Sequence, residues 1–510
     1  MTEEILRTMA FLDERLPRPR RRSLQYGLAG AALALCLGSC SAPDAPVTPT
    51  AAPLAVSTAP PAKPAHPNVL FILADTLRAD RITMQRDDRP LMPNLAKLAG
   101  ESRHYANCRA QAAWTKPSMA TLFTSLYPGV HRVLFGIDRH LEAVQTPQSD
   151  ILPDAYETMA EYLKAHGFAT AGVQSNTHVT EYFGFSQGFD SYVVKRHPEF
   201  HGADITNAAF EELDKLKPPF FLYAHYMDVH GPYDLPKDHP GRPTPPADLT
   251  ESDRQLLDNW NDGYLDLVFF QVGLAPTRQF GDFSPAGQAY VKMKYDLSAR
   301  YLDSELGRLV ERVSSRHPNT IIVLAADHGE ELFEHGSVGH AKTVFEEVIH
   351  VPLLIKVPGE APQVIDAPVG LVDVLPTLAG LLGLPPRAEW QGRDASSTDS
   401  LPPTDRPIFG QAEITITGSN RHLEMAVVGA RKLIVDTKKD SRTVFDLEQD
   451  PGELAGFPPG NIPDDAHLAQ VLEQQISMEL NSPQRQQTPA TTELTDEQRE
   501  RIKMIGYLQE

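Results

Sequence analysis

Three stretches of consecutive apolar residues stand out in this chain, and each runs directly into acidic or histidine residues. The stretches are NVLFILA at 68–74, PFFLYA at 219–224 and TIIVLAA at 320–326. Apolar runs of this length are typical of strands that are buried on both faces of a parallel sheet. We therefore expect three such strands in the core of a large sheet.

The segments between these strands favour helices. Residues 156–166 and 288–315 have helical patterns, and a further apolar run, 351–357, follows them. This alternation predicts an α/β fold with a doubly wound sheet.

The polar residues at the carboxyl ends of the three runs are types that bind metal ions. They are Asp75 after the first run, His225, Asp228 and His230 after the second, and Asp327-His328 after the third. In open α/β sheets, ligands bind outside the carboxyl ends of the strands. One such residue alone would be interpreted as a cap or a solvated side chain. Three strand ends of the same kind favour a shared metal site.

A fourth element, residues 113–128, predicts a helix that runs to about Leu126 and has Pro117 in its first turn. Thr115 then lies near the N-cap of this helix, where backbone N–H groups and the helix dipole favour an anion. A threonine at such a position is, taken alone, usually only a cap.

The first 66 residues have the features of an export signal followed by a tether. Four arginines between positions 18 and 22 precede an apolar run, 26–39, that is too short to span a bilayer as a helix. The run ends in Leu-Gly-Ser-Cys40, which resembles a bacterial lipobox. We expect a signal peptide at 1–39, a lipidated Cys40, and a Pro/Ala/Thr-rich tether at 40–66. The mature protein would then be a membrane-anchored lipoprotein that faces the periplasm or the cell exterior. The alternative is a signal anchor with an incidental cysteine.

Composition and charge narrow the classes of partner. The 510 residues are 41% hydrophobic and 22% charged, which is typical of a globular protein. The formal charge of -20 argues against a nonspecific nucleic-acid binder, because such a protein needs a basic surface. The three cysteines form neither a disulfide framework nor a zinc motif, and we expect Cys108 to be a small buried side chain.

Four blocks, in order along the chain, resemble the sulfatase family of the alkaline phosphatase superfamily. They are DTLRAD at 75–80, WTKPS to PGVH at 114–131, FFLYAHYMDVHGPY at 220–233, and ADHGEELFEHG to KVPG at 326–359. The tail, including residues 431–435, 444–453 and 505–507, is similar to the C-terminal subdomain of bacterial members. The resemblance implies a catalytic domain at 67–400 with a large mixed, mostly parallel sheet. It also implies an α+β subdomain at 401–510 with a small antiparallel sheet and a terminal helix.

The chain departs from the family pattern at the nucleophile. Typical sulfatases oxidise a Cys or Ser in a C/S-x-P-x-R context to formylglycine, whereas the matching positions here are Thr115 and Met119. A secondary alcohol cannot be oxidised to that aldehyde. The family's Asp-Asp pair is Asp75-Thr76 in this chain, and its Asp-Asn pair is Asp327-His328.

These departures resemble phosphate-transferring members of the superfamily, in which a metal-bound threonine is the nucleophile. The resemblance implies that the ligands of at least one divalent metal ion are Asp75, Thr115, Asp327 and His328. Mixed oxygen and nitrogen ligation favours Mn²⁺ or Zn²⁺ over Ca²⁺. A second metal ion bound by Asp228, His230 and His340 is an alternative, but the spacing does not reproduce the motif of two-metal relatives.

Further residues are expected to bind the remaining ester oxygens or to protonate the leaving group. They are His225, His230, His340 and Lys342, with His131 and Lys116 as weaker candidates. His230 is the first choice for the acid, because it matches the catalytic histidine of the family. His335 belongs to a glycine-flanked loop and is interpreted as shaping that loop.

The expected function is a metal-dependent ester hydrolase of the cell envelope that favours phosphate or phosphonate esters. Its substrate would be a small molecule or an envelope glycan or lipid ester. Three alternatives stay open: a true sulfuric ester hydrolase, a transferase that moves a phospho-group to an envelope acceptor, and an inactive lipoprotein that binds glycans or anions.

Overall fold

The computed structural model describes residues 66–134, 148–195, 201–262, 283–416, 419–457, 465–485 and 491–493. The described residues belong to one compact unit, the larger of two in the chain. The expected signal peptide, Cys40 and nearly all of the expected tether lie outside the described residues. Within the described residues, no helix has the length and apolar character that a bilayer crossing requires.

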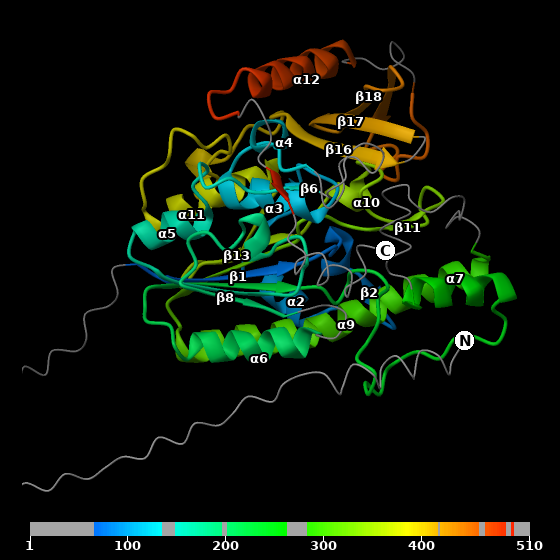
Figure 1. The fold of residues 1–510 in the computed structure, drawn as a ribbon, viewed down its shortest axis with the longest axis horizontal. Helices are drawn as coiled ribbons and strands as arrows, with labels where there is room; N and C mark the ends of the chain where they lie inside the picture. Colours follow the sequence, from blue (N-terminus) through cyan, green and yellow to red (C-terminus); the bar gives the residue numbers. More distant parts are fainter. Residues whose placement is uncertain are drawn as a thin grey trace, which may run out of the picture. The chain divides into compact units, whose positions relative to one another are not determined.

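An eight-stranded mixed sheet forms the centre of the larger unit (Figure 1). Its strands, in spatial order, are β14 (Gln363–Ile365), β4 (Arg103–Tyr105), β13 (Leu353–Lys356), β10 (Thr320–Ala325), β1 (Asn68–Ala74), β9 (Phe220–Tyr226), β7 (Ala169–Gln174) and β8 (Ser191–Val194). The five strands from β10 to β8 run parallel to one another. Strand β13 is antiparallel to both of its neighbours, β10 and β4. The expected α/β fold with a mostly parallel sheet is confirmed.

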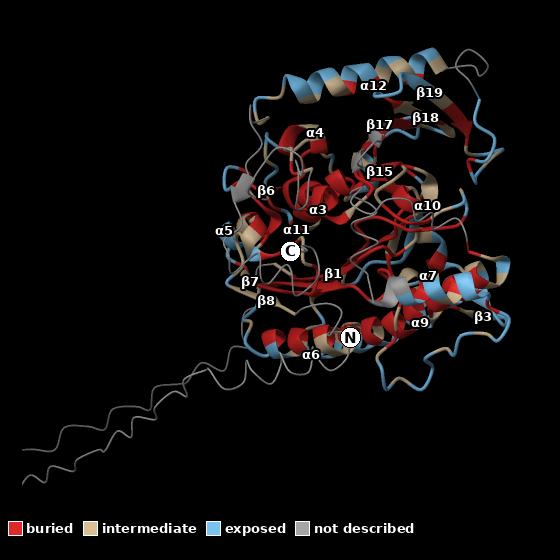
Figure 2. Ribbon diagram, turned by 45° about the vertical axis from the view of Figure 1, so that its right-hand side comes forward, coloured by how far each residue is buried: buried red, intermediate tan, exposed pale blue. Residues whose placement is uncertain are grey.

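Helices cover both faces of this sheet (Figure 1). On one face lie α2 (Pro93–Ala99), α6 (Gly202–Leu213) and α9 (Pro285–Arg316), and on the other lie α3 (Thr115–Thr124), α5 (Met159–Ala165) and α11 (Val374–Leu382). Further helices are α4 (Pro128–His131), α7 (Glu251–Asp262) and α10 (Glu346–Ile349). All ten residues of α3 are buried (Figure 2), so this helix belongs to the core.

The three apolar runs form the central strands because each is covered on both sides. Every residue of β1, β9 and β10 is buried. The parallel register pairs Leu73 of β1 with Ala325 of β10 and with His225 of β9. The carboxyl ends of the three strands are therefore level, and the polar residues that follow them meet at one edge of the sheet.

A four-stranded antiparallel sheet lies at the C-terminal side of the chain. It consists of β16 (Ile408–Ile416), β17 (Ser419–Val428), β18 (Arg431–Asp436) and β19 (Ser441–Asp446), and α12 (Asp465–Leu480) packs on it through Leu468 and Leu472. The small subdomain therefore has the expected type of sheet and a helix after it. The tail at 505–507 lies outside the described residues. The boundary placed at residue 400 stays a prediction.

Short strand pairs complete the larger unit. They are β2 (Gln85–Arg86) with β3 (Arg89–Pro90), β5 (Cys108–Arg109) with β15 (Val369–Gly370), β11 (Glu331–Leu332) with β12 (Val338–Gly339), and β6 (Gln148–Asp150) with β20 (Thr491–Glu493). Cys108 is fully buried in β5, which agrees with its expected role as a small core side chain.

Candidate active site

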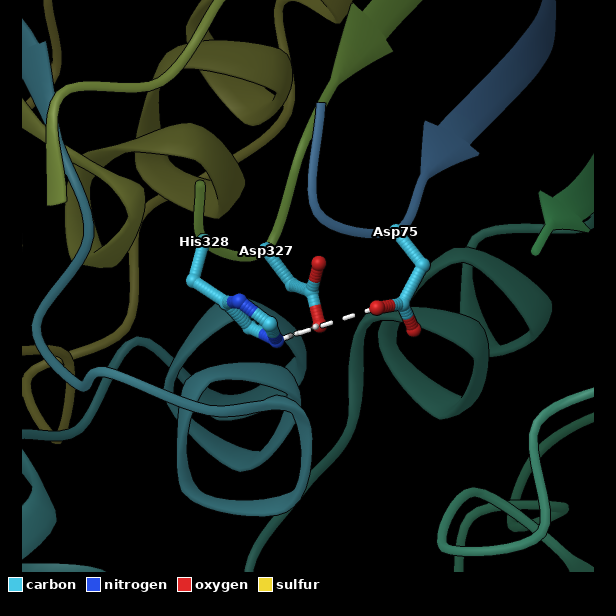
Figure 3. Close-up of side chains that lie close together, drawn as sticks. All are labelled: Asp75, Asp327 and His328. Atoms are coloured by element: carbon cyan, nitrogen blue, oxygen red, sulfur yellow. Dashed lines mark ion pairs between the residues drawn. The ribbon is translucent and has the colours of Figure 1, made fainter. Parts of the chain in front are cut away.

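Three side chains from the ends of β1 and β10 converge on one point (Figure 3). They are Asp75, Asp327 and His328, and each offers a ligand atom within 4.8 Å of the others. All three residues have no exposed surface. This is the only group of three such side chains with metal-ligand geometry among the described residues.

The surroundings of Asp75 leave one of its oxygens for a cation. His225 and Asn176 donate hydrogen bonds to Oδ2, over 3.0 and 2.8 Å. The other oxygen, Oδ1, has no hydrogen-bond partner, although it is buried. His225 is itself held at Nδ1 by the hydroxyl of Tyr223, over 2.9 Å. His225 therefore lies behind Asp75 and orients it, a different place from the substrate contact expected from the sequence.

Asp327 and His328 are arranged in the same way. The backbone N–H of Thr76 donates to Oδ1 of Asp327 over 3.3 Å, and Oδ2 is buried without a hydrogen-bond partner. Nδ1 of His328 lies 2.9 Å from the carbonyl of Gly329, to which it donates its proton. The lone pair of Nε2 is then turned toward the carboxylates, 3.3 Å from Oδ2 of Asp327.

These groups fit a divalent cation. Burial raises the pKa of Asp75, and it raises the pKa of Asp327 to about 6 with a further contribution from the negative charge of Asp75. Burial lowers the pKa of His328, which keeps its imidazole neutral and able to bind metal. Two buried oxygens without partners and one imidazole nitrogen form a mixed donor set, which suits Mn²⁺ or Zn²⁺.

Thr115 lies beside this centre, at the first position of α3 after the N-cap residue Trp114. Its Oγ1 is 3.4 Å from Oδ2 of Asp75 and 3.3 Å from Nε2 of His328. Ser118, one turn further, donates its hydroxyl to the carbonyl of Asp327 over 2.5 Å. This bond joins the first turn of the helix to the end of β10 and thereby fixes the position of Thr115.

Thr76 occupies the place of the family's second aspartate, but it does not join the ligand group. Its hydroxyl donates to the carbonyl of Val229 over 2.5 Å. Its φ is 58°, a left-handed conformation that is unfavourable for a β-branched residue. Such strain is typical of functional sites. The conformation aims the backbone N–H of Thr76 at Asp327.

Two histidines expected to contact the ester lie next to the centre. The ring of His340 is 4.4 Å from that of His328 and 5.0 Å from that of His230, measured between centroids. Burial lowers the pKa of His340 to about 4. Lys342 follows in the same loop, and its ammonium donates to Ser337 and to the carbonyl of Val338, each over 2.9 Å.

Other expected residues lie in different surroundings. Asp228 accepts a hydrogen bond from the backbone N–H of Gly202 at the start of α6. Among the described residues, Asp228, His230 and His340 do not form a group with metal-ligand geometry, so the alternative of a second metal site gains no support. His131 bonds to Thr121 over 3.1 Å, on the second turn of α3 rather than at Thr115. These contacts were not predictable because chain spacing does not show to which side a loop residue turns.

Two more expected residues have structural contacts. The ammonium of Lys116 donates to Ser149 over 2.5 Å and lies 3.7 Å from the centroid of the Phe183 ring. Burial lowers the pKa of Lys116 to about 7. His335 stacks on Phe345, with ring centroids 3.7 Å apart, which supports its interpretation as a loop-shaping residue.

Asn176 and Glu330 were missed by the sequence analysis. Asn176 donates to Asp75 and also lies 3.4 Å from Oγ1 of Thr115. It follows β7, so it stands at the same sheet edge as the other ligands. Because β7 (ATAGVQ) includes Gly, Thr and Gln, it is not a continuous apolar run. Glu330 lies 2.8 Å from Nδ1 of His340.

Comparisons with known proteins point to one family. The family model described as Sulfatase matches residues 67–384. Human iduronate 2-sulfatase is 26% identical over 400 residues, which are 63% of this chain and 70% of that protein. A sulfatase of Formosa agariphila is 25% identical over 439 residues, with 76% of this chain and 82% of that protein covered.

Solved structures show the same fold. A 2-O GAG sulfatase superposes with a TM-score of 0.65 at 17% identity, over 83% of this chain and 97% of the other. A phosphonate monoester hydrolase from Silicibacter pomeroyi superposes with a TM-score of 0.59 at 18% identity, over 81% and 95%.

Proposed function

Because this chain belongs to the sulfatase family of the alkaline phosphatase superfamily, it is a hydrolase of sulfuric or phosphoric esters, and we propose that Thr115 is its nucleophile. We further propose that phosphate or phosphonate esters are preferred over sulfate esters. The observation that carries this proposal is the position of Oγ1 of Thr115, within 3.4 Å of both Asp75 and His328.

The identity of the nucleophile supports the preference for phosphorus. A threonine cannot be oxidised to formylglycine, and Met119, at the position of the usual arginine partner, is fully buried and apolar. The site therefore has a simple alcohol, which forms a stable ester when it attacks phosphorus. A phosphonate monoester hydrolase among the structural neighbours shows that this fold accommodates phosphorus esters.

A divalent cation bound by Asp75, Asp327 and His328 would neutralise charge on the ester oxygens and lower the pKa of the Thr115 hydroxyl. The hydroxyl of Thr115 gives its proton to water as Oγ1 forms a bond to phosphorus, and the bond from phosphorus to the leaving oxygen breaks with its electron pair on that oxygen. The N-terminal turn of α3 stabilises the negative nonbridging oxygens. Water then attacks the phosphothreonine and regenerates the enzyme.

The remaining roles fall to side chains around this centre. Asn176 and His225 hold Asp75 in place through their hydrogen bonds to its Oδ2. We propose His230 and His340 as the groups that protonate the leaving group, and their ring contacts beside the centre support this role.

Sulfate ester hydrolysis is the second candidate function. It is favoured by the relatives, since the human and Formosa proteins are named as sulfatases. A transferase with an envelope acceptor would use the same residues and would differ only in requiring that acceptor. An inactive binding protein is the weakest alternative, because it has no need of a threonine beside a set of metal ligands.

We also propose that the protein is exported and anchored through a lipidated Cys40. The proposal rests on the lipobox-like sequence Leu-Gly-Ser-Cys40 after a short apolar run. Mass spectrometry of the mature N-terminus tests it. A diacylglyceryl-modified Cys40 as the first residue is expected, and an unmodified or retained N-terminus would refute it.

The full chain and its Thr115→Ala variant should be assayed on aryl phosphate monoester, phosphodiester, phosphonate monoester and sulfate ester. The protein is first treated with a chelator, and Mn²⁺, Zn²⁺ or Ca²⁺ is then added. We expect metal-dependent cleavage of a phosphorus ester that the variant loses. Cleavage of the sulfate ester alone would refute the phosphorus preference. Product formation only with an added alcohol acceptor would favour the transferase.

A further inference from the structure

Glu330 is a buried carboxylate beside the centre that the proposed mechanism does not use. It is 1% exposed and lies two residues after His328. Its Oε2 lies 2.8 Å from Nδ1 of His340, and its Oε1 accepts a hydrogen bond from the hydroxyl of Tyr233 over 2.7 Å. Both oxygens therefore have defined partners, and the carboxylate joins two segments that are 107 residues apart in the sequence.

The backbone and the second partner of Glu330 are fixed as well. Arg78 donates to the carbonyl of Glu330 over 3.0 Å. The ring of Tyr233 packs edge-on against Tyr295, with centroids 5.2 Å apart, and the hydroxyl of Tyr295 donates to the carbonyl of Thr76 over 2.9 Å. A continuous set of contacts thus connects the strained Thr76 turn with Glu330.

We propose that Glu330 is the positioning residue of His340, and that His340 thereby delivers a proton to the leaving oxygen. This inference rests on the proposed function. Because Nδ1 of His340 is hydrogen-bonded to Glu330, His340 contacts the ester through its other ring nitrogen, Nε2. The centroid of the His340 ring lies 4.4 Å from that of the His328 ring. The side chain that bears Nε2 therefore packs against one of the proposed metal ligands.

The proton balance of the step is simple. The step requires one proton in the hydrogen bond between Nδ1 of His340 and Oε2 of Glu330 and a second proton on Nε2. As the bond from phosphorus or sulfur to the leaving oxygen breaks, its electron pair stays on that oxygen, which takes the proton from Nε2. Nε2 keeps a lone pair, and Glu330 retains the hydrogen bond to Nδ1, as the carboxylate does in a catalytic triad.

A second carboxylate–histidine pair nearby in the sequence offers a matched control for this pair. Glu347 lies 2.7 Å from Nδ1 of His335, and that imidazole stacks on Phe345 rather than on a ligand of the centre. Glu347→Gln therefore removes the same kind of carboxylate–imidazole contact, here between α10 and the loop that holds His335. His230 differs from both histidines, because its Nδ1 lies 3.1 Å from the carbonyl of its neighbour Gly231.

The kinetic test uses the full chain with a series of aryl esters that differ in the acidity of the leaving phenol. Glu330→Gln should lower kcat about 100-fold for an unsubstituted phenyl ester, with only a small change for a dinitrophenyl ester, because a good leaving group needs no proton. Tyr233→Phe should give a smaller change with the same trend. Glu347→Gln should not alter the dependence on the leaving group. An equal loss for all leaving groups in Glu330→Gln would overturn the proposal.

A second measurement does not depend on activity. The ¹⁵N shifts of histidine side chains report the tautomer, and His340→Asn identifies the signal of His340. We expect Glu330→Gln to shift this signal and Glu347→Gln to leave it in place. An unchanged His340 signal in Glu330→Gln would contradict the positioning role. If the wild-type chain cleaves no ester, the proposed function fails, while this spectrum still tests the pair.

Discussion

Two buried charged clusters of this molecule differ in what neutralises their carboxylates. In the first, Asp75 and Asp327 face imidazoles, and each has a buried oxygen without a hydrogen-bond partner. In the second, Glu346 and Glu453 face Lys432, whose ammonium is fully buried and lies 3.1 and 2.8 Å from their oxygens. The second cluster carries its own cation, and the first requires one from outside.

The pKa values of Asp327 and Glu346 show the same difference, although burial raises the pKa of Glu453 in the second cluster as well. Burial raises the pKa of Asp327 to about 6. Burial also opposes the charged form of Glu346, but the nearby Arg109 and Lys432 outweigh it and hold the pKa of Glu346 well below its usual range. Full burial alone therefore does not distinguish a functional cluster from a structural one. The balance of fixed charges does.

The largest effect should come from the centre itself. Thr115→Ala removes the attacking oxygen, and we expect about a 10⁴-fold loss of kcat or more, measured with the ester that the wild type cleaves fastest. Thr124→Ala is the matched control, because that hydroxyl lies on the same helix and bonds to the carbonyl of Ala120. Comparable activity of Thr115→Ala and wild type would exclude the threonine mechanism.

The next largest effect concerns the second cluster, in which Lys432 neutralises Glu346 and Glu453. Lys432→Ala leaves two buried carboxylates without their ammonium partner, so the free energy of unfolding should fall by about 3–5 kcal/mol. Denaturant unfolding of the full chain measures this change. The loss should be the same with and without added metal. A variant as stable as the wild type would show that this cluster does not need its lysine, and the contrast would disappear.

A metal ion should stabilise the folded protein by binding at the first cluster and not at the second. At a concentration of 100 times its Kd, the ion should raise the free energy of unfolding of the wild type by about 2.7 kcal/mol. Asp327→Asn should lose this response, since it lacks one of the two buried oxygens that have no other partner. Thermal unfolding with and without Mn²⁺ or Zn²⁺ measures the shift. An equal shift in both proteins would place the metal elsewhere.

The smallest effect on stability is expected at Glu479, a carboxylate that has a neutral hydrogen-bond donor as its partner. Glu479 of α12 accepts a hydrogen bond from Gln475 over 2.7 Å, and burial raises the pKa of Glu479 to about 7. A carboxyl group whose pKa is higher in the folded state stabilises the fold fully only at a pH below its pKa in the unfolded chain. This stabilisation is lost as the pH rises through the folded-state pKa of about 7. Glu479→Gln should therefore gain about 1 kcal/mol relative to the wild type between pH 4.5 and 8. Parallel pH curves of the two proteins would contradict the shift.

Much of the fold was predictable because the apolar pattern reports burial directly. The run at 68–74 matches β1 residue for residue. The helix expected at 288–315 begins three residues earlier, since Ser284 caps it and Pro285 occupies its first turn. The helix expected at 156–166 begins at Met159, because Thr158 forms a capping box with Glu161.

The centre was predictable where residues follow apolar strands, as Asp75, Asp327 and His328 do. The positions of residues in loops were not predictable, because the direction of a loop side chain depends on tertiary contacts. Asp228 turned toward α6, and Glu330 met His340 across a loop that the sequence does not fold by itself.

The most direct test of the central claim is a search for a covalent intermediate on Thr115. The metal-loaded full chain is mixed with excess cleavable ester, quenched with acid during turnover, digested and examined by mass spectrometry. We predict a phosphoryl- or phosphonyl-group adduct on Thr115 that is absent in Thr115→Ala. Turnover that proceeds with Thr115 unmodified, together with full activity of Thr115→Ala, would contradict the account.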